Sequence, residues 1–70
     1  MTKKNYIRIA KAINEQRQIA LNIKQDQKEI GEARLHGIAS VMYHLAEYFR
    51  EDNPRFNQEK FIDACYKETL

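Results

Sequence analysis

The scarcity of turn-forming residues is the strongest constraint on the fold of this chain. Its 70 residues include two glycines, Gly31 and Gly37, and a single proline, Pro54. Sharp turns rely on such residues, so few chain reversals are available. Apolar residues make up 43% of the chain and charged residues 31%, which is typical of a small globule and not of a disordered segment. The sequence therefore predicts one all-α domain over residues 1–70, a bundle of two or three helices.

The first helix is predicted to begin after Thr2, which is a good N-cap residue. Apolar side chains then recur at three- and four-residue spacing, as one buried helical stripe requires. They are Tyr6, Ile9, Ala10 and Ile13. The stripe drifts after Gln16, so the sequence leaves open whether residues 16–26 continue the helix or form a break.

A long central helix is predicted from about residue 27 to Asp52. Asp26 and Glu29 have the spacing of a capping box, with the aspartate as cap. The apolar residues of this helix cover an arc of about 160°, wider than the roughly 100° stripe of a helix buried on one side. They are Ile30, Leu35, Ile38, Val41, Met42, Leu45, Ala46, Tyr48 and Phe49. Such a helix needs contacts on two sides, from its own chain alone or from its own chain and another subunit.

The segment DNPRFNQEKFIDAC, residues 52–65, predicts a corner between two helices. Asn53-Pro54 ends the central helix, because the residue before proline is disfavoured in the helical conformation. Asn57 is a good N-cap for a short third helix that folds back, and Phe56 and Phe61 have the spacing of a hydrophobic staple. The inward face of this helix is expected to hold Phe61, Ile62, Cys65 and Thr69.

Chain length and charge limit the classes of function. A chain of this size buries only roughly 60% of its unfolded surface, so association would relieve marginal stability, and we expect a homo-oligomer. Residues 1–24 carry a net charge of +5, residues 25–53 carry −3, and the remainder is neutral. The start lacks the apolar stretch of a signal peptide and no apolar run approaches about 20 residues, so we expect a reduced protein in the cytoplasm and no membrane partner.

Catalysis and metal binding are not favoured by the residues present. His36 and His44 are eight positions apart, about 12 Å along a helix axis, which is too far for one ion. Cys65 falls on an apolar helix face, where a lone cysteine usually serves as a small buried hydrophobe. No glycine-rich phosphate loop or nucleophile elbow is present. We therefore expect no enzyme activity, no metal and no cofactor.

Two sets of residues are candidates for binding. Tyr43, Tyr48, Phe49 and Arg55 are candidates for a protein interface, because aromatic residues and arginine are enriched at interface hot spots. A basic row on the first helix could instead contact nucleic-acid phosphates, as an alternative function. That row is Lys3, Lys4, Arg8 and Lys11.

The segment TKKNY at one end of the chain and the segment DNPRFNQEKFIDAC at the other resemble motifs of a group of small phage and prophage proteins of unknown function. The first end matches a start of T-K-K, Asp or Asn, and an aromatic residue, here TKKNY. The other matches D-N-P-R-F followed by an Asn or Asp, a basic residue, Phe and Ala-Cys. In this chain those positions are Asp52, Asn53, Pro54, Arg55, Phe56, Asn57, Lys60, Phe61, Ala64 and Cys65. The resemblance implies a small accessory protein in a bacterial host and carries over no site residue.

The function expected from the sequence is therefore binding to another protein through helical surfaces. The partner would be a host or phage protein, and the process it modulates is not specified by any motif. Nucleic-acid binding through the basic row is the alternative.

Overall fold

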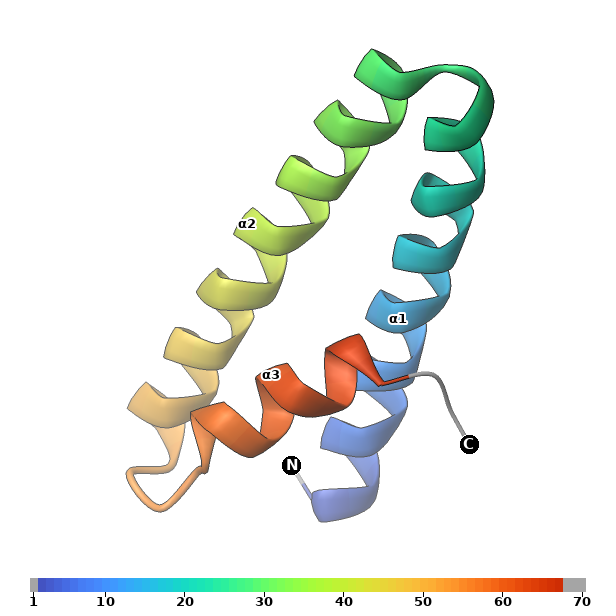
Figure 1. Ribbon diagram of the computed structural model, residues 1–70. Helices are drawn as coiled ribbons and strands as arrows, with labels where there is room; N and C mark the ends of the chain where they lie inside the picture. The colour runs from blue at the N-terminus through green and yellow to red at the C-terminus, as the bar shows by residue number, and fades with distance from the viewer. Residues whose placement is uncertain (1, 68–70) are drawn as a thin grey trace.

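The computed structural model describes residues 2–67, which form three α-helices joined by two short turns. These are α1 (Lys3–Asp26), α2 (Lys28–Asp52) and α3 (Gln58–Tyr66). The first two run antiparallel from a tight connection and separate toward their other ends, and α3 lies across the open end of this V (Figure 1). The predicted all-α fold, with a short third helix folded back after Pro54, is confirmed.

The predicted helix boundaries at Thr2, Asp52 and Asn57 are confirmed. The Thr2 hydroxyl accepts a hydrogen bond from the Asn5 N–H at 3.4 Å, and Asn57 Oδ1 accepts one from the Lys60 N–H at 3.0 Å. Each cap satisfies a backbone donor that the first helical turn leaves free. α2 ends at Asp52, directly before Asn53-Pro54.

The connection between α1 and α2 differs from the prediction of a capping box at Asp26. Asp26 is the last residue of α1, which continues without interruption through residues 16–26. Gln27 alone separates the two helices: its N–H donates to the Ile23 carbonyl at 2.7 Å, and its carbonyl accepts from the Gly31 N–H at 3.0 Å. One backbone unit thus serves the end of one helix and the start of the next, without a side-chain cap.

Gly31 allows the close approach that this short connection imposes. A Cβ atom at Gly31 would lie 2.5 Å from both Cα and Cβ of Lys24 on α1, inside van der Waals contact. Gly37, six residues later, has open space where its Cβ would be. The two glycines therefore have different roles, although both weaken the helix by intrinsic propensity.

The core lies at the open end of the V, where α3 fills the space between α1 and α2. Four aromatic rings from separate parts of the chain pack together on one side of this core: Tyr6, Phe49, Phe56 and Phe61. Phe49 and Phe61 are buried, and Tyr6 and Phe56 are half-buried against them. Ring centroids are 4.9 Å apart for Tyr6 and Phe49, and 5.5 Å apart for Phe49 and Phe61. The remaining buried core consists of small or aliphatic side chains: Ala10, Ile13, Met42, Ala46 and Cys65.

The predicted inward face of α3 is confirmed for the residues that the structure describes. Phe61 and Cys65 are buried, and Ile62 is half-buried against the core. Phe56 and Phe61 make the predicted staple contact, with ring centroids 5.7 Å apart. Thr69, expected on the same face, lies outside the described residues.

Replacing each glycine by alanine separates close packing from helix propensity. We expect Gly31→Ala to lower the free energy of unfolding by about 1–3 kcal/mol, because α1 and α2 must move apart. Gly37→Ala is the matched control and should raise it by up to about 1 kcal/mol, since alanine is the better helix former. Urea denaturation of both variants at one protein concentration measures the difference. Equal effects of the two substitutions would contradict the close contact at Gly31.

Candidate functional site

The interface residues predicted from sequence do not form one patch. Tyr43 and Tyr48 on α2 are each more than half exposed, and Arg55 is exposed in the turn before α3. Phe49 is only 8% exposed and packs against Tyr6, so the expectation that it lies at a binding surface is replaced by a core role. Phe49 is buried inside the V because its side chain faces both α1 and α3.

The predicted basic row also divides between two faces of α1. Lys3, Ile7 and Ala10 share one face by their four- and three-residue spacing, and all three border a groove beside α3. Lys4, Arg8 and Lys11 each follow these residues by one position, so they lie about 100° further round the helix. All four basic residues of the row are exposed.

The groove, which we term the α1–α3 groove, lies between the start of α1, the turn after α2, and α3. Its apolar surface comes from Tyr6, Ile7, Ala10, Phe56, Phe61 and Ala64. Ile7 is the most accessible of these, with 55% of its surface exposed. An exposed isoleucine beside aromatic rings forms a concave apolar surface of the kind that binding sites use.

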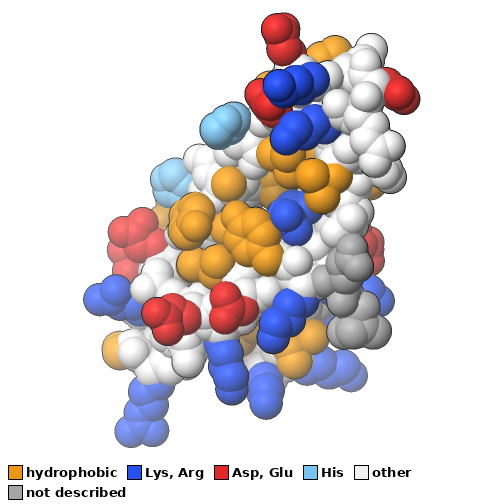
Figure 2. Space-filling model, viewed as in Figure 1, with side chains coloured by type: hydrophobic (Ala, Val, Ile, Leu, Met, Phe, Trp, Pro, Cys, Tyr) orange, Lys and Arg blue, Asp and Glu red, His pale blue; other side chains and the backbone are white. Residues whose placement is uncertain are grey.

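The borders of the α1–α3 groove are basic. Lys3, Arg55, Lys60 and Lys67 line it, against a single acidic residue, Asp63. Lys and Arg side chains gather at the end of the molecule where α3 meets the start of α1 (Figure 2). No ion pair with a carboxylate engages these cations within residues 2–67. The groove thus combines an apolar surface with an excess of positive charge.

The turn between α2 and α3 fixes one side of this groove. Asn53 Oδ1 accepts a hydrogen bond from the Arg55 N–H at 3.1 Å, and the Asn53 carbonyl accepts one from the Phe56 N–H at 2.8 Å. These bonds direct Phe56 toward Tyr6, with ring centroids 4.5 Å apart, and leave the Arg55 side chain exposed. The segment predicted as a helical corner therefore also forms part of the candidate site.

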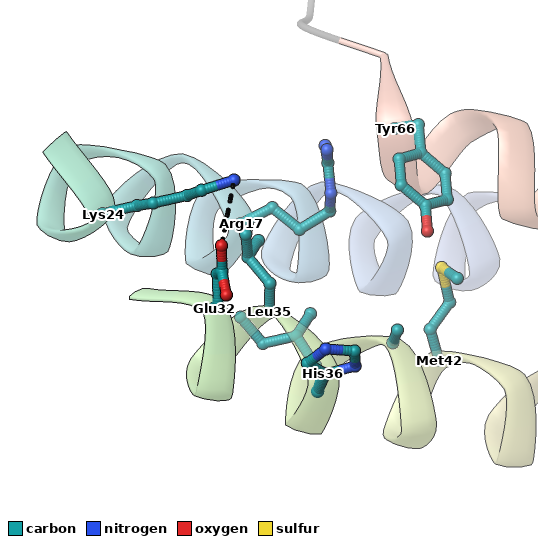
Figure 3. Close-up of a pocket in the computed structure, with 9 residues that line it drawn as sticks. Arg17, Lys24, Glu32, Leu35, His36, Met42 and Tyr66 are labelled. Atoms are coloured by element: carbon teal, nitrogen blue, oxygen red, sulfur yellow. Dashed lines mark ion pairs between the residues drawn. The ribbon is translucent and has the colours of Figure 1, made fainter. Parts of the chain in front are cut away.

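A second concave surface lies between α1 and α2 on the other side of α3 (Figure 3). The Arg17 guanidinium lies over the Tyr66 ring, 4.2 Å from its centroid, a cation–π arrangement that joins α1 to α3. Arg17 also donates to Asn14 Oδ1 at 3.3 Å, and the Asn14 amide donates to the Lys67 carbonyl. Arg17 thereby helps to hold the end of α3 in place, so we do not assign it to a ligand.

The remaining polar residues of this cleft are only loosely organised. Lys24 and Glu32 form an ion pair at 3.9 Å with both side chains about 40% exposed, an arrangement worth little stability. His36 lines the cleft, whereas the His44 Nδ1 lies 2.8 Å from the Ser40 carbonyl. Within residues 2–67 no three His, Cys, Asp or Glu side chains are grouped as metal ligands.

Cys65 is completely buried in the core. Burial raises the pKa of its thiol from 9.0 to about 11, and the positive charge of Arg17 opposes this effect. The neutral thiol contributes stability that is fully present below pH 9 and is lost as the pH rises toward 11. Cys65 is therefore a packing residue and a poor nucleophile.

No protein family, curated protein or solved structure gives a significant match to this chain. Of the helices described here, none offers the long, uninterrupted apolar stretch that crossing a bilayer requires. The candidate site must therefore be interpreted from its own residues.

The chemistry of Cys65 gives a direct test of the folded core. At pH 8, a pKa of about 11 in place of 9.0 leaves about 100-fold less thiolate. We expect iodoacetamide to alkylate the native chain at least that much more slowly than the chain unfolded in guanidinium chloride at the same pH. Mass spectrometry over time measures both rates. A native rate close to the unfolded one would contradict the burial of Cys65.

Proposed function

We propose that this chain is a small phage or prophage accessory protein that acts in the bacterial cytoplasm by binding another protein. The observation that carries the proposal is the α1–α3 groove, which joins exposed Ile7 to an apolar surface bordered by four cations. The resemblance of the two chain ends to phage proteins supports the biological setting. The groove supports the mode of action.

The partner segment favoured by this groove is acidic and amphipathic. Aspartate and glutamate would face Arg55, Lys60 and their neighbours, and leucine- or phenylalanine-like side chains would cover Ile7 and Phe56. Charge complementarity of this kind speeds association and selects the partner, while apolar contacts supply affinity. The partner would be a host or phage protein that carries such a segment.

Nucleic-acid binding by the basic row of α1 is the alternative. Lys4, Arg8 and Lys11 lie on a different face from the groove, next to Glu15, and their neighbours Ala12 and Gln16 provide no aromatic platform for bases. The apolar surface beside Lys3 has no use in phosphate binding, which depends on charge and weakens steeply with salt. These features favour a protein partner.

Selection from a displayed peptide library tests the proposal without knowledge of the host. We expect enrichment of peptides that combine acidic and large apolar residues. Affinity measured by fluorescence polarisation should fall at least about tenfold for both Ile7→Glu and Lys60→Glu. The first substitution removes an apolar contact, and the second removes a positive charge that faces the acidic residues of the peptide.

Arg8→Glu is the matched control, because it makes the same charge change on the neighbouring face of α1. It should alter peptide affinity by less than about twofold, since exposed charges outside a contact are screened. Fluorescence polarisation with labelled duplex DNA and RNA at low salt covers the alternative. Binding of nucleic acid that is lost in Arg8→Glu and retained in Ile7→Glu would overturn the protein-binding proposal.

A further inference from the structure

One face of α2 is apolar and uncovered by the rest of the chain. α1 and α3 both lie on the same side of α2 (Figure 1). On the side they leave free, Ile30, Val41 and Tyr48 are between 51% and 56% exposed. Ile38 and Leu45 lie between this face and the core and are half-buried. The wide apolar arc predicted for this helix is therefore only partly covered within the chain.

The residues of this face follow the spacing of a helix–helix seam. We use the name α2 seam for Arg34, Ile38, Val41, Leu45, Tyr48 and Asp52. Successive members are separated by four, three, four, three and four residues, which is the alternation of core positions in a coiled coil. The four inner positions are apolar, and the two outer positions carry opposite charges.

The order of residues in the α2 seam specifies the direction in which a second copy would pair. The spacing is the same in both directions and is centred on position 43. An antiparallel copy would thus place Val41 opposite Leu45, Ile38 opposite Tyr48, and Arg34 opposite Asp52, with every contact made twice. A parallel copy would place Arg34 beside Arg34 and Asp52 beside Asp52, which is unfavourable.

Neither outer charge is used inside the chain. Arg34 and Asp52 are both exposed, and neither forms an ion pair within the part of the chain that the structure describes. Tyr43 is exposed as well, but it follows Val41 by two residues and so projects about 200° further round the helix, away from the seam. The seam also shares no residue with the α1–α3 groove.

We propose that two copies of this chain associate through their α2 seams as an antiparallel, two-fold symmetric dimer, with Arg34 of each copy paired to Asp52 of the other. The dimer buries Val41 and Tyr48, which the monomer leaves more than half exposed. A closed two-fold interface of this kind is the commonest form of homo-oligomer. The pairing leaves both α1–α3 grooves free, so the dimer would be bivalent for the proposed partner.

Charge exchange across the seam tests the pairing. Sedimentation equilibrium should show a dimer of the wild type at micromolar concentration. Arg34→Asp and Asp52→Arg alone should each weaken dimerisation by at least about tenfold, because each places like charges opposite one another twice. The combined variant should return to within about threefold of the wild type, since its two changes act on one contact.

Val41→Glu and Tyr43→Glu form the matched pair for the apolar part of the seam. Val41→Glu should give a monomer with unchanged helical circular dichroism, because the residue is exposed in the single chain. Tyr43→Glu should remain dimeric. A wild type that sediments as an 8.3 kDa monomer, or a dimer insensitive to Val41→Glu, would overturn the proposal.

Disulfide crosslinking reports the direction of the two helices. Cys65 can stay in place because it is buried. Under mild oxidation, the double variant Ile38→Cys with Tyr48→Cys should form covalent dimers, whereas Tyr48→Cys alone should not. Two Tyr48 positions are about 15 Å apart along an antiparallel pair centred on position 43, beyond disulfide reach. Efficient crosslinking of the single Tyr48→Cys variant would show a parallel pair and overturn this arrangement.

Discussion

The cluster of Tyr6, Phe49, Phe56 and Phe61 is the interaction on which the rest of this fold depends. Its four rings come from the start of α1, the end of α2, the turn and α3, so it joins every part of the chain except the α1–α2 connection. Offset and edge-to-face aromatic pairs contribute beyond the area that they bury. Toward the α1–α2 connection, Ala20 is buried and Gly31 allows close contact with Lys24, but these small residues supply little apolar area. Most of the apolar stabilisation is thus at the open end of the V. The tip has the Gln27 backbone hydrogen bonds and the weak Lys24–Glu32 ion pair.

Local signals in the sequence were sufficient to predict a bundle of two or three helices and most of the helix ends. Thr2, Asn53-Pro54 and Asn57 act on backbone groups within a few residues of themselves, and the structure shows all three at helix ends. Asp26 is not the cap of α2 because it is itself the last residue of α1, so Gln27 takes the N-cap position, without a side-chain hydrogen bond. The contact of Gly31 with Lys24, and that of Arg17 with Tyr66, depend on how the helices cross. The periodicity of apolar residues within one helix does not predict how two helices cross.

The residues of the candidate site also come together only through the way in which the helices pack. Its members Arg55 and Lys3 appeared in separate predicted sets, one for protein and one for nucleic acid. The structure brings both to the α1–α3 groove, because α3 folds back across the start of α1. The role of Ile7 could not be predicted from the sequence. A single isoleucine on an amphipathic helix does not indicate a binding site until its neighbours in space are known. Phe49, in contrast, was predicted at a binding surface and is buried in the core.

The long separation between Tyr6 and its partners in the aromatic cluster has a consequence for how this protein is made. Tyr6 is synthesised 50 residues before Phe56 and 55 residues before Phe61. Until they emerge, the apolar face of α1 has only part of its cover, and contacts between such distant residues are slow to form because the intervening chain must first close into a loop. The core therefore cannot close before α3 has been synthesised and has emerged. A chain cut short before α3 would leave Tyr6 and Phe49 more exposed to water, and so open to aggregation and proteolysis.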